Sequence, residues 1–438
     1  MRSSRASGDS ACELLTQDTS SGYTESVLYR FQGGRDGDDP RGGLIMDSAG
    51  NLYGTTQDGG DINGDGTVFK LMPDGGGYTE STLYRFPGGS DGDDPLGDLI
   101  RDSTGNFYGV AGGGSSNCPL GCGVVFKLAP DSGGGYTESV VHLFQGGSDG
   151  SSPVEGLIMD RAGNLYGATS DGGGIRNCPL YDRECGVVFK LVPDGSGGYT
   201  ESILYRFRGG DDGWSPETRL IMDRAGNLYG TAAGGRSNCP LGIGCGVVFK
   251  LAPDGSDGYT ESILYRFRGG SDGWAPFGRL TIGRAGNLYG TAGFGGNNRS
   301  NRECSHYGCG VVFKLAFDGS GGYRESILYR FQGGSDGAGP ESRLIMDGAG
   351  DLYGTTVGGG SNKCNGGCGT VFKLTPDGSG GYTESVLYRF RGSSDGWSPY
   401  DLALRHAGDL YGTMQLGGNS SGHCSVAGCG FVYEIHLH

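Results

Sequence analysis

The sequence predicts an all-β protein, a seven-bladed β-propeller with four antiparallel strands in each blade. The chain of 438 residues contains 95 Gly, which excludes an ordinary helical protein because Gly is unfavourable inside helices. Each of seven repeats carries short runs rich in Val, Ile, Tyr, Phe and Thr, bounded by Gly, Pro, Asp or Asn, as strands are. The repeats begin with a Tyr-x-Glu-Ser unit every 55 to 64 residues, at Tyr23, Tyr78, Tyr136, Tyr199, Tyr259, Tyr323 and Tyr382.

The first copy gives the order of the predicted strands. They cover residues 26–31, 43–47, 51–56 and 67–71, with a Gly-Gly-x-Asp-Gly-x-x-Pro loop after the first and a variable loop before the last. Gly50 stands where a hairpin turn needs a positive φ, and Pro-Asp-Gly segments such as the one at Pro73 predict the next turn. A β-solenoid is the structural alternative, but its coils are usually shorter and do not need four strands.

The two ends of the chain predict how the ring closes. The chain starts with the fourth strand of a copy and ends with the third, over residues 430–435. We therefore expect the N-terminal outer strand to pair with the C-terminal inner strands in one blade. A single propeller domain is expected over residues 23–438, after a flexible polar segment at residues 1–22.

The repeats resemble a known family. Residues 52–56 (LYGTT), 66–71 (GTVFKL) and 90–92 (SDG) are similar to the GloVer tandem repeat, named for Gloeobacter and Verrucomicrobia, and the likeness covers Tyr23 to Ile435. The resemblance implies a bacterial, exported protein with no assigned catalytic residues. No signal peptide is visible in this chain.

Charge and hydropathy exclude two classes of partner. The net charge of −15 and the pI of about 4.8 argue against nucleic acid, because phosphate binding needs a basic surface. The longest apolar runs are too short to cross a bilayer, so no membrane insertion is expected. The sequence leaves the oligomeric state open.

Twelve of the 13 cysteines form close pairs, one in each of the last six blades. Disulfides within each loop are the favoured interpretation, with free thiols and metal binding as alternatives. Disulfides predict an oxidising compartment and hence an extracellular or cell-surface protein. The pairs are Cys118 with Cys122, Cys178 with Cys185, Cys239 with Cys245, Cys304 with Cys309, Cys364 with Cys368, and Cys424 with Cys429.

The first blade has no cysteine pair, and its corresponding loop suggests calcium. Asp61, Asn63 and Asp65 follow the D-x-N-x-D-G order of a calcium loop, in which alternate side chains supply oxygen ligands. The alternative is a polar turn, because Met72 stands where such a loop has its final Glu. No other cofactor is expected.

The Asp-Gly-x-x-Pro loop also repeats in every copy. Its Asp is interpreted as a turn-capping residue that accepts backbone N–H bonds. Two positions later the sequence varies, and all three tryptophans of the chain, Trp214, Trp274 and Trp397, fall there. They are candidates for stacking on a glycan or anchoring a protein, or else for packing over the next blade. We expect these loops and the cysteine loops to share one face.

Enzymatic signals are weak, because none of the six His recurs at a repeat position and no nucleophile, phosphate-loop or dinucleotide motif is present. The sequence favours a non-enzymatic, exported or surface-associated protein that binds a glycan or protein through its loop-rich face. The alternatives are a structural scaffold or assembly subunit, and a hydrolase or lyase with its site at the axial mouth.

Overall fold

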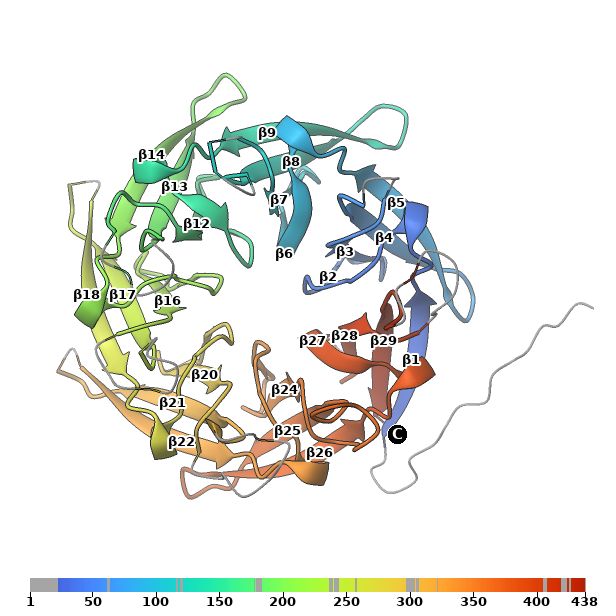
Figure 1. The fold of residues 1–438 in the computed structure, drawn as a ribbon, viewed down its shortest axis with the longest axis vertical. Coiled ribbons are helices and arrows are strands. Elements are labelled where there is room, and N and C mark those ends of the chain that lie inside the picture. Colours follow the sequence, from blue (N-terminus) through green and yellow to red (C-terminus); the bar gives the residue numbers. More distant parts are fainter. Residues whose placement is uncertain are drawn as a thin grey trace, which may run out of the picture.

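The computed structural model of the chain is a ring of seven small sheets around a central axis (Figure 1). The predicted fold class is therefore confirmed. The predicted flexible segment, residues 1–22, lies outside the described residues. The described residues are 23–60, 64–115, 117–118, 121–176, 178, 183–235, 239, 244–256, 258–296, 304, 307–320, 322–404, 408–418, 424 and 427–437.

Each blade is an antiparallel sheet, and in the first six blades the strands follow one another in sequence order from the axis to the outer edge. The first two blades are β2 (Ile45–Met46), β3 (Leu52–Thr56), β4 (Thr67–Pro73) and β5 (Tyr78–Arg85), and β6 (Asp93–Arg101), β7 (Phe107–Gly112), β8 (Val124–Pro130) and β9 (Tyr136–Leu143). In the third, β10 (Ser151–Pro153) and β11 (Ile158–Met159) together form the innermost strand beside β12 (Leu165–Asp171), β13 (Val187–Pro193) and β14 (Tyr199–Arg206). The fourth and fifth are β15 (Ile221–Met222), β16 (Leu228–Ala232), β17 (Val247–Pro253) and β18 (Tyr259–Arg266), and β19 (Thr281–Ile282), β20 (Leu288–Ala292), β21 (Val311–Phe317) and β22 (Tyr323–Arg330). The sixth is β23 (Ile345–Met346), β24 (Leu352–Thr356), β25 (Thr370–Pro376) and β26 (Tyr382–Arg389).

The seventh blade closes the ring in the predicted way. Its inner strands are β27 (Trp397–Leu404), β28 (Leu410–Leu416) and β29 (Phe431–Leu437), and its outer strand is β1 (Tyr23–Arg30). β1 pairs with β29 from Tyr23 opposite Leu437 to Arg30 opposite Phe431. The two ends of the described chain are thus joined through one hydrogen-bonded ladder.

The hydrophobic core lies between neighbouring blades. One buried cluster, for example, joins Tyr229 and Val248 of the fourth blade to Trp274, Leu288 and Phe313 of the fifth. Because both faces of every sheet are covered, the strands do not need the strict alternation of a half-exposed sheet. Among the described residues, no helix has the length and apolarity of a membrane span.

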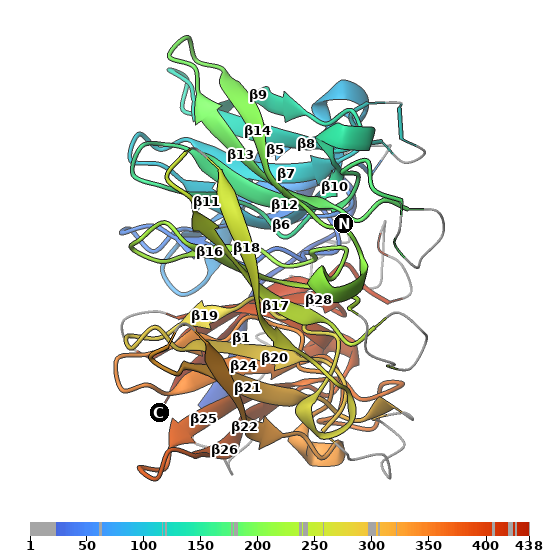
Figure 2. The same cartoon turned by 90° about the vertical axis from the view of Figure 1, so that its left-hand side faces the viewer.

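The loop between the second and third strands of a blade is tied to the connector that enters the next blade. The N–H of Ser152 donates to the carbonyl of Cys122 (2.9 Å), and Ser215 and Cys185 form the equivalent bond (2.9 Å). The two kinds of loop therefore share a face, and the one-turn helices of the connectors lie on the right of the ring in Figure 2.

Six disulfides close these loops, which removes free thiols and metal binding as alternatives for the paired cysteines. In every pair the second cysteine, which comes just before the third strand, is completely buried in the core between blades. The bonds join Cys118 to Cys122, Cys178 to Cys185, Cys239 to Cys245, Cys304 to Cys309, Cys364 to Cys368, and Cys424 to Cys429.

The repeated Asp caps its turn as predicted. Asp212, for example, accepts the backbone N–H of Arg208 and the hydroxyl of Tyr205, both at 2.9 Å. The repeated Arg of the outer strands reaches a carbonyl of the preceding connector. Arg85, for example, donates through Nε to the carbonyl of Arg35 at 2.9 Å.

Candidate functional site

The axis of the ring is lined by one repeat position that differs from blade to blade. In each repeat a buried Leu, such as Leu99 or Leu220, anchors the innermost segment. The residue before this Leu lies at the axis. Its place in the repeat is the same in all copies, but its side chain differs from copy to copy. In blade order these residues are Gly43, Asp98, Gly156, Arg219, Arg279, Arg343 and Asp401.

Ion pairs across the axis form a narrow waist. Nη1 of Arg219, from the fourth blade, and Nη1 of Arg279, from the fifth, each lie 2.6 Å from Oδ2 of Asp98, which comes from the second blade. The N–H of Gly43 donates to Oδ1 of Asp98 at 2.7 Å. Burial works to raise the pKa of Asp98, but the arginines outweigh it and hold that pKa below its ordinary value.

Arg343 completes the waist from the sixth blade. Its Nη2 lies 3.6 Å from Oδ2 of Asp401 and donates to the carbonyl of Leu402. Three arginines face two aspartates, so this ring of residues carries an excess of one positive charge. Within the described part of the chain, Nε of Arg219, Arg279 and Arg343 and Oδ1 of Asp401 are buried without a hydrogen-bond partner. The waist therefore has unused donors.

A cavity of about 500 Å³, the upper chamber, opens from the waist toward the loop-rich face. Its walls carry Glu155, Glu217, Glu341, Phe277 and Tyr400. Burial, followed by the charge of Asp98, raises the pKa of Glu155 to about 7. Burial, followed by the charge of Glu217, also raises the pKa of Glu341 to about 7. Two carboxyl groups that change protonation near neutral pH therefore share one chamber.

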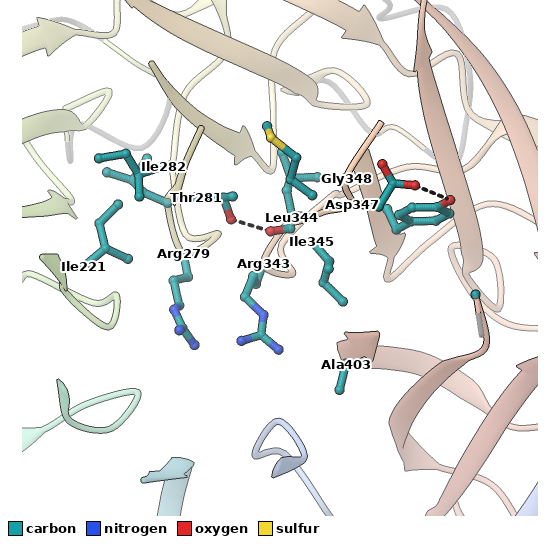
Figure 3. A pocket seen from close by; sticks show the side chains of 14 residues that line it. Ile221, Arg279, Thr281, Ile282, Arg343, Leu344, Ile345, Asp347, Gly348 and Ala403 are labelled. Carbon is teal, nitrogen blue, oxygen red and sulfur yellow. Dashed lines mark hydrogen bonds between the residues drawn. The ribbon is translucent and has the colours of Figure 1, made fainter. Parts of the chain in front are cut away.

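A second cavity of about 960 Å³, the lower chamber, lies on the opposite side of the waist. Ile221, Ile282 and Ile345 give it an apolar wall, whereas Arg279 and Arg343 line both chambers. Figure 3 shows these two arginines side by side, extending from neighbouring inner segments into the centre of the ring. The two chambers thus share these arginines, whereas Glu155, Glu217 and Glu341 line the upper chamber.

The predicted tryptophan sites are mostly buried. Trp214 and Trp274 are 7% and 2% exposed, and the ring of Trp274 stacks on Phe294 with 4.6 Å between centroids. Stacking on a ligand needs an open ring face, and neither residue offers one, so here the packing alternative describes the structure. Trp397 is half-buried and lines a separate pocket of about 470 Å³ with Lys363 and Arg391.

Of the predicted calcium ligands, Asp61 and Asn63 lie outside the described residues, and Asp65 lies within them. Asp65 is close to two further carboxylates. Burial, and then the charge of Asp65, raises the pKa of Asp93. The charge of Asp65 also contributes to the raised pKa of Asp94. Calcium binding by this loop stays a prediction.

Neither the waist nor the upper chamber was identified from the sequence. The available signal was the contrast between a constant Leu and the changing residue before it, where charges occur in five of seven copies. In the sequence this segment resembles a plain strand, and the candidate ligand-binding residues that the sequence suggested lie in the outer loops.

A protein-family model described as the Gloeobacter/Verrucomicrobia repeat matches the chain three times, over residues 8–181, 119–302 and 300–437. No curated protein sequence gives a significant match. Among solved structures, virginiamycin B lyase from Staphylococcus aureus is similar with a TM-score of 0.53 and 13% identity, over 95% of this chain and 99% of that one. At this identity the likeness concerns the fold alone.

Two further solved structures resemble the chain less well. A gluconolactonase from Xanthomonas campestris has a TM-score of 0.41 and 12% identity, over 95% of this chain and 90% of that one. A PQQ-bound aldose sugar dehydrogenase from Streptomyces coelicolor has a TM-score of 0.42 and 13% identity, over 95% and 98% of the two chains.

Proposed function

We propose that this chain, which belongs to the Gloeobacter/Verrucomicrobia repeat family, binds an acidic carbohydrate in the upper chamber of its axial channel. The observation that carries the proposal is the set of buried arginines with unused Nε donors at the floor of a polar cavity. The six disulfides favour an oxidising compartment, which fits an exported or surface-associated protein.

The arginines account for the acidic group of the ligand. Guanidinium groups bind carboxylates through paired, charge-assisted hydrogen bonds. Arg279 and Arg343 line the upper chamber, and the waist has one positive charge in excess of its aspartates. A ligand carboxylate would engage the buried donors and balance that charge.

The walls of the chamber account for the sugar. Glu155, Glu217 and Glu341 offer carboxyl oxygens to ligand hydroxyl groups, while Phe277 supplies an apolar surface for a ring face. A volume of about 500 Å³ lies within the range of small-molecule sites. Trp397 is our candidate for a secondary contact with a longer glycan, since it is the partly exposed tryptophan on the same face.

Calorimetric titration of the full chain with a uronic acid oligosaccharide and with its neutral hexose counterpart tests the proposal. We expect the acidic sugar to bind at least tenfold more tightly. Arg279→Met should abolish this preference, whereas Arg284→Met, an exposed residue five positions later in the same blade, should not. Equal affinity for the two sugars, or no binding of either, contradicts the proposal.

The acid–base properties of the chamber favour a second candidate, an enzyme that acts on the bound sugar. Glu155 and Glu341, with pKa values of about 7, could supply a general base and a general acid near neutral pH. Mass spectrometry of acidic oligosaccharides incubated with the protein distinguishes the two. Products that disappear in Glu155→Gln support the enzyme, and an unchanged oligosaccharide supports binding alone.

A further inference from the structure

One boundary between blades differs from the others in a single side chain. At five boundaries an outer-strand tyrosine donates to the Asp of the following connector, as Tyr205 does to Asp212 at 2.9 Å and Tyr388 to Asp395 at 2.7 Å. In the second blade His142 takes the place of this tyrosine. The register confirms the equivalence, because His142 pairs with Val125 as Tyr205 pairs with Val188.

The imidazole of His142 faces two carboxylates. Its Nε2 lies 3.6 Å from Oδ1 of Asp149 and 3.8 Å from Oε1 of Glu201. Asp149 ends the connector helix η3 (Gly147–Asp149), and Glu201 lies on β14, the outer strand of the third blade. One ligand atom from each residue lies within 4.8 Å of the other two. The cluster therefore joins the second blade, the connector and the third blade.

These separations are too long for hydrogen bonds and suit atoms that share a metal ion. Nε2 of His142 and Oε1 of Glu201 are both buried without a hydrogen-bond partner in the described structure. With metal–ligand bonds of about 2.0–2.1 Å, tetrahedral ligand atoms stand roughly 3.3 Å apart, so a small inward movement would suffice. At the five boundaries described above the tyrosine hydroxyl bonds directly to the Asp, which leaves no room for an ion.

The composition of the cluster points the same way. Two carboxyl groups and one imidazole nitrogen converge on one point, and a divalent cation can bind all three. The N–H of Gln145 donates to Oδ2 of Asp149 at 2.6 Å, which holds that carboxylate in position.

We propose that His142, Asp149 and Glu201 bind one divalent transition-metal ion, Zn²⁺ by the preference of this ligand set, and that the ion clips the second blade to the third. A second His-containing cluster within the described residues has a different geometry. His436 directs Nδ1 at Asp409 (3.4 Å) and Nε2 at Glu434 (3.1 Å), so a single nitrogen does not face both carboxylates.

The test uses His142→Tyr, which restores the residue of the other repeats and is expected to fold. Chelator-treated full chain is titrated with Zn²⁺ under non-reducing conditions, and metal content is measured after gel filtration. Wild type should retain one Zn²⁺ per chain and gain about 2 °C or more in Tm at 100-fold excess over Kd. Co²⁺ should give the absorption of a tetrahedral site. His142→Tyr should bind at least 100-fold more weakly, and His436→Gln should behave as wild type.

Other outcomes overturn the proposal. If wild type takes up no Zn²⁺, the cluster is an ion pair and nothing more. If His142→Tyr binds as tightly as wild type, the ion lies elsewhere, and loss of binding in His436→Gln would place it at the C-terminal cluster. The single variant Asp149→Asn should also weaken Zn²⁺ binding. It tests the proposal independently if His142→Tyr fails to fold.

Discussion

The hydroxyl group of Tyr400 donates a hydrogen bond of 2.9 Å to Oε1 of Glu155, from the seventh blade to the third. This bond favours the ionised carboxyl group and so works against the burial that raises the pKa of Glu155. Tyr400→Phe should therefore raise that pKa above about 7 and reduce the free energy of unfolding by about 1–3 kcal/mol at pH 8. NMR titration of the Glu side chains and urea unfolding measure the two effects.

Tyr136→Phe, on the outer strand of the second blade, is the control for this experiment and should leave the titration of Glu155 unchanged. A Glu155 pKa that falls in Tyr400→Phe would contradict the assignment of this hydrogen bond.

Stability should decline between pH 5 and pH 8.5. Burial is the first cause that raises the pKa of eight carboxyl groups to between about 6 and about 8. Between these pKa values the folded protein binds protons that the unfolded chain has released. The contribution of the eight groups to stability is therefore complete below their unfolded pKa, near 4.5 for Glu, and is lost as the pH rises through their pKa values in the folded protein. The eight are Asp38, Glu25, Glu138, Glu155, Glu201, Glu325, Glu341 and Glu384.

Scanning calorimetry as a function of pH measures this decline, and Glu384→Gln should make it shallower because an amide mimics the protonated acid. The hairpin aspartates, such as Asp160 and Asp223, act in the opposite direction. Burial opposes ionisation there, but hydrogen bonds lower their pKa, so their contribution is lost as the pH falls below 3.8. The stability maximum should thus lie between about pH 4.5 and pH 6, and a Tm that rises up to pH 8 would refute this balance.

Removal of one disulfide should destabilise the protein modestly. Cys364 and Cys368 are four residues apart in sequence, and closing so short a loop is worth about 2 kcal/mol in the chain-entropy model. The double variant with Cys364→Ser and Cys368→Ser should lose that amount in guanidinium unfolding without reductant. Loss of the bond between Cys118 and Cys122 in another blade should add to it, and a strongly non-additive result would mean that the loops are coupled.

The tryptophans should differ in their contribution to stability. Trp274 is 2% exposed against Phe294, so Trp274→Ala should cost about 3–5 kcal/mol in unfolding free energy. Trp397 is half-buried, and Trp397→Ala should cost clearly less. The reverse order would show that the buried indole is not part of the packed core.

Calcium should stabilise the first blade if its loop binds the ion as predicted. Asp65 lies near Asp93 and Asp94, whose raised pKa values reflect burial and then neighbouring charge, and a cation would relieve this repulsion. Millimolar Ca²⁺ should raise the Tm of wild type but not of Asp65→Asn. An unchanged Tm in wild type would leave the polar turn as the correct interpretation.

Features repeated in every copy were predictable from the sequence. Seven versions of each strand and turn reveal the pattern, so the hairpin at Asp47, the capping role of Asp212 and the pairing of β1 with β29 were all expected. The cysteine pairs were predictable for the same reason, since their spacing within each loop favours a local bond. That Cys245, Cys309 and Cys429 are fully buried was not predicted, because the sequence indicated only that each pair lies in a loop between strands.

The axial site could not be predicted, because its contacts depend on differences between copies. Asp98 and Arg219 are 121 residues apart and meet only because the ring closes. Packing of Trp274 was one of the two interpretations that the sequence offered, but its partner Phe294, in a loop that varies from blade to blade, was not identified. A repeat pattern reports what the copies share, whereas the proposed axial site lies where they differ.

The ladder between β1 and β29 also determines how the ring responds to force. Tyr23 and Leu437 are paired, so both free ends leave the sheet at the same edge. Tension applied to the termini would peel the ladder apart one pair at a time and would not load all its bonds at once. The seventh blade is therefore the mechanically weakest part of the ring. Its β1–β29 pairing should separate at low force, before the other six sheets unfold.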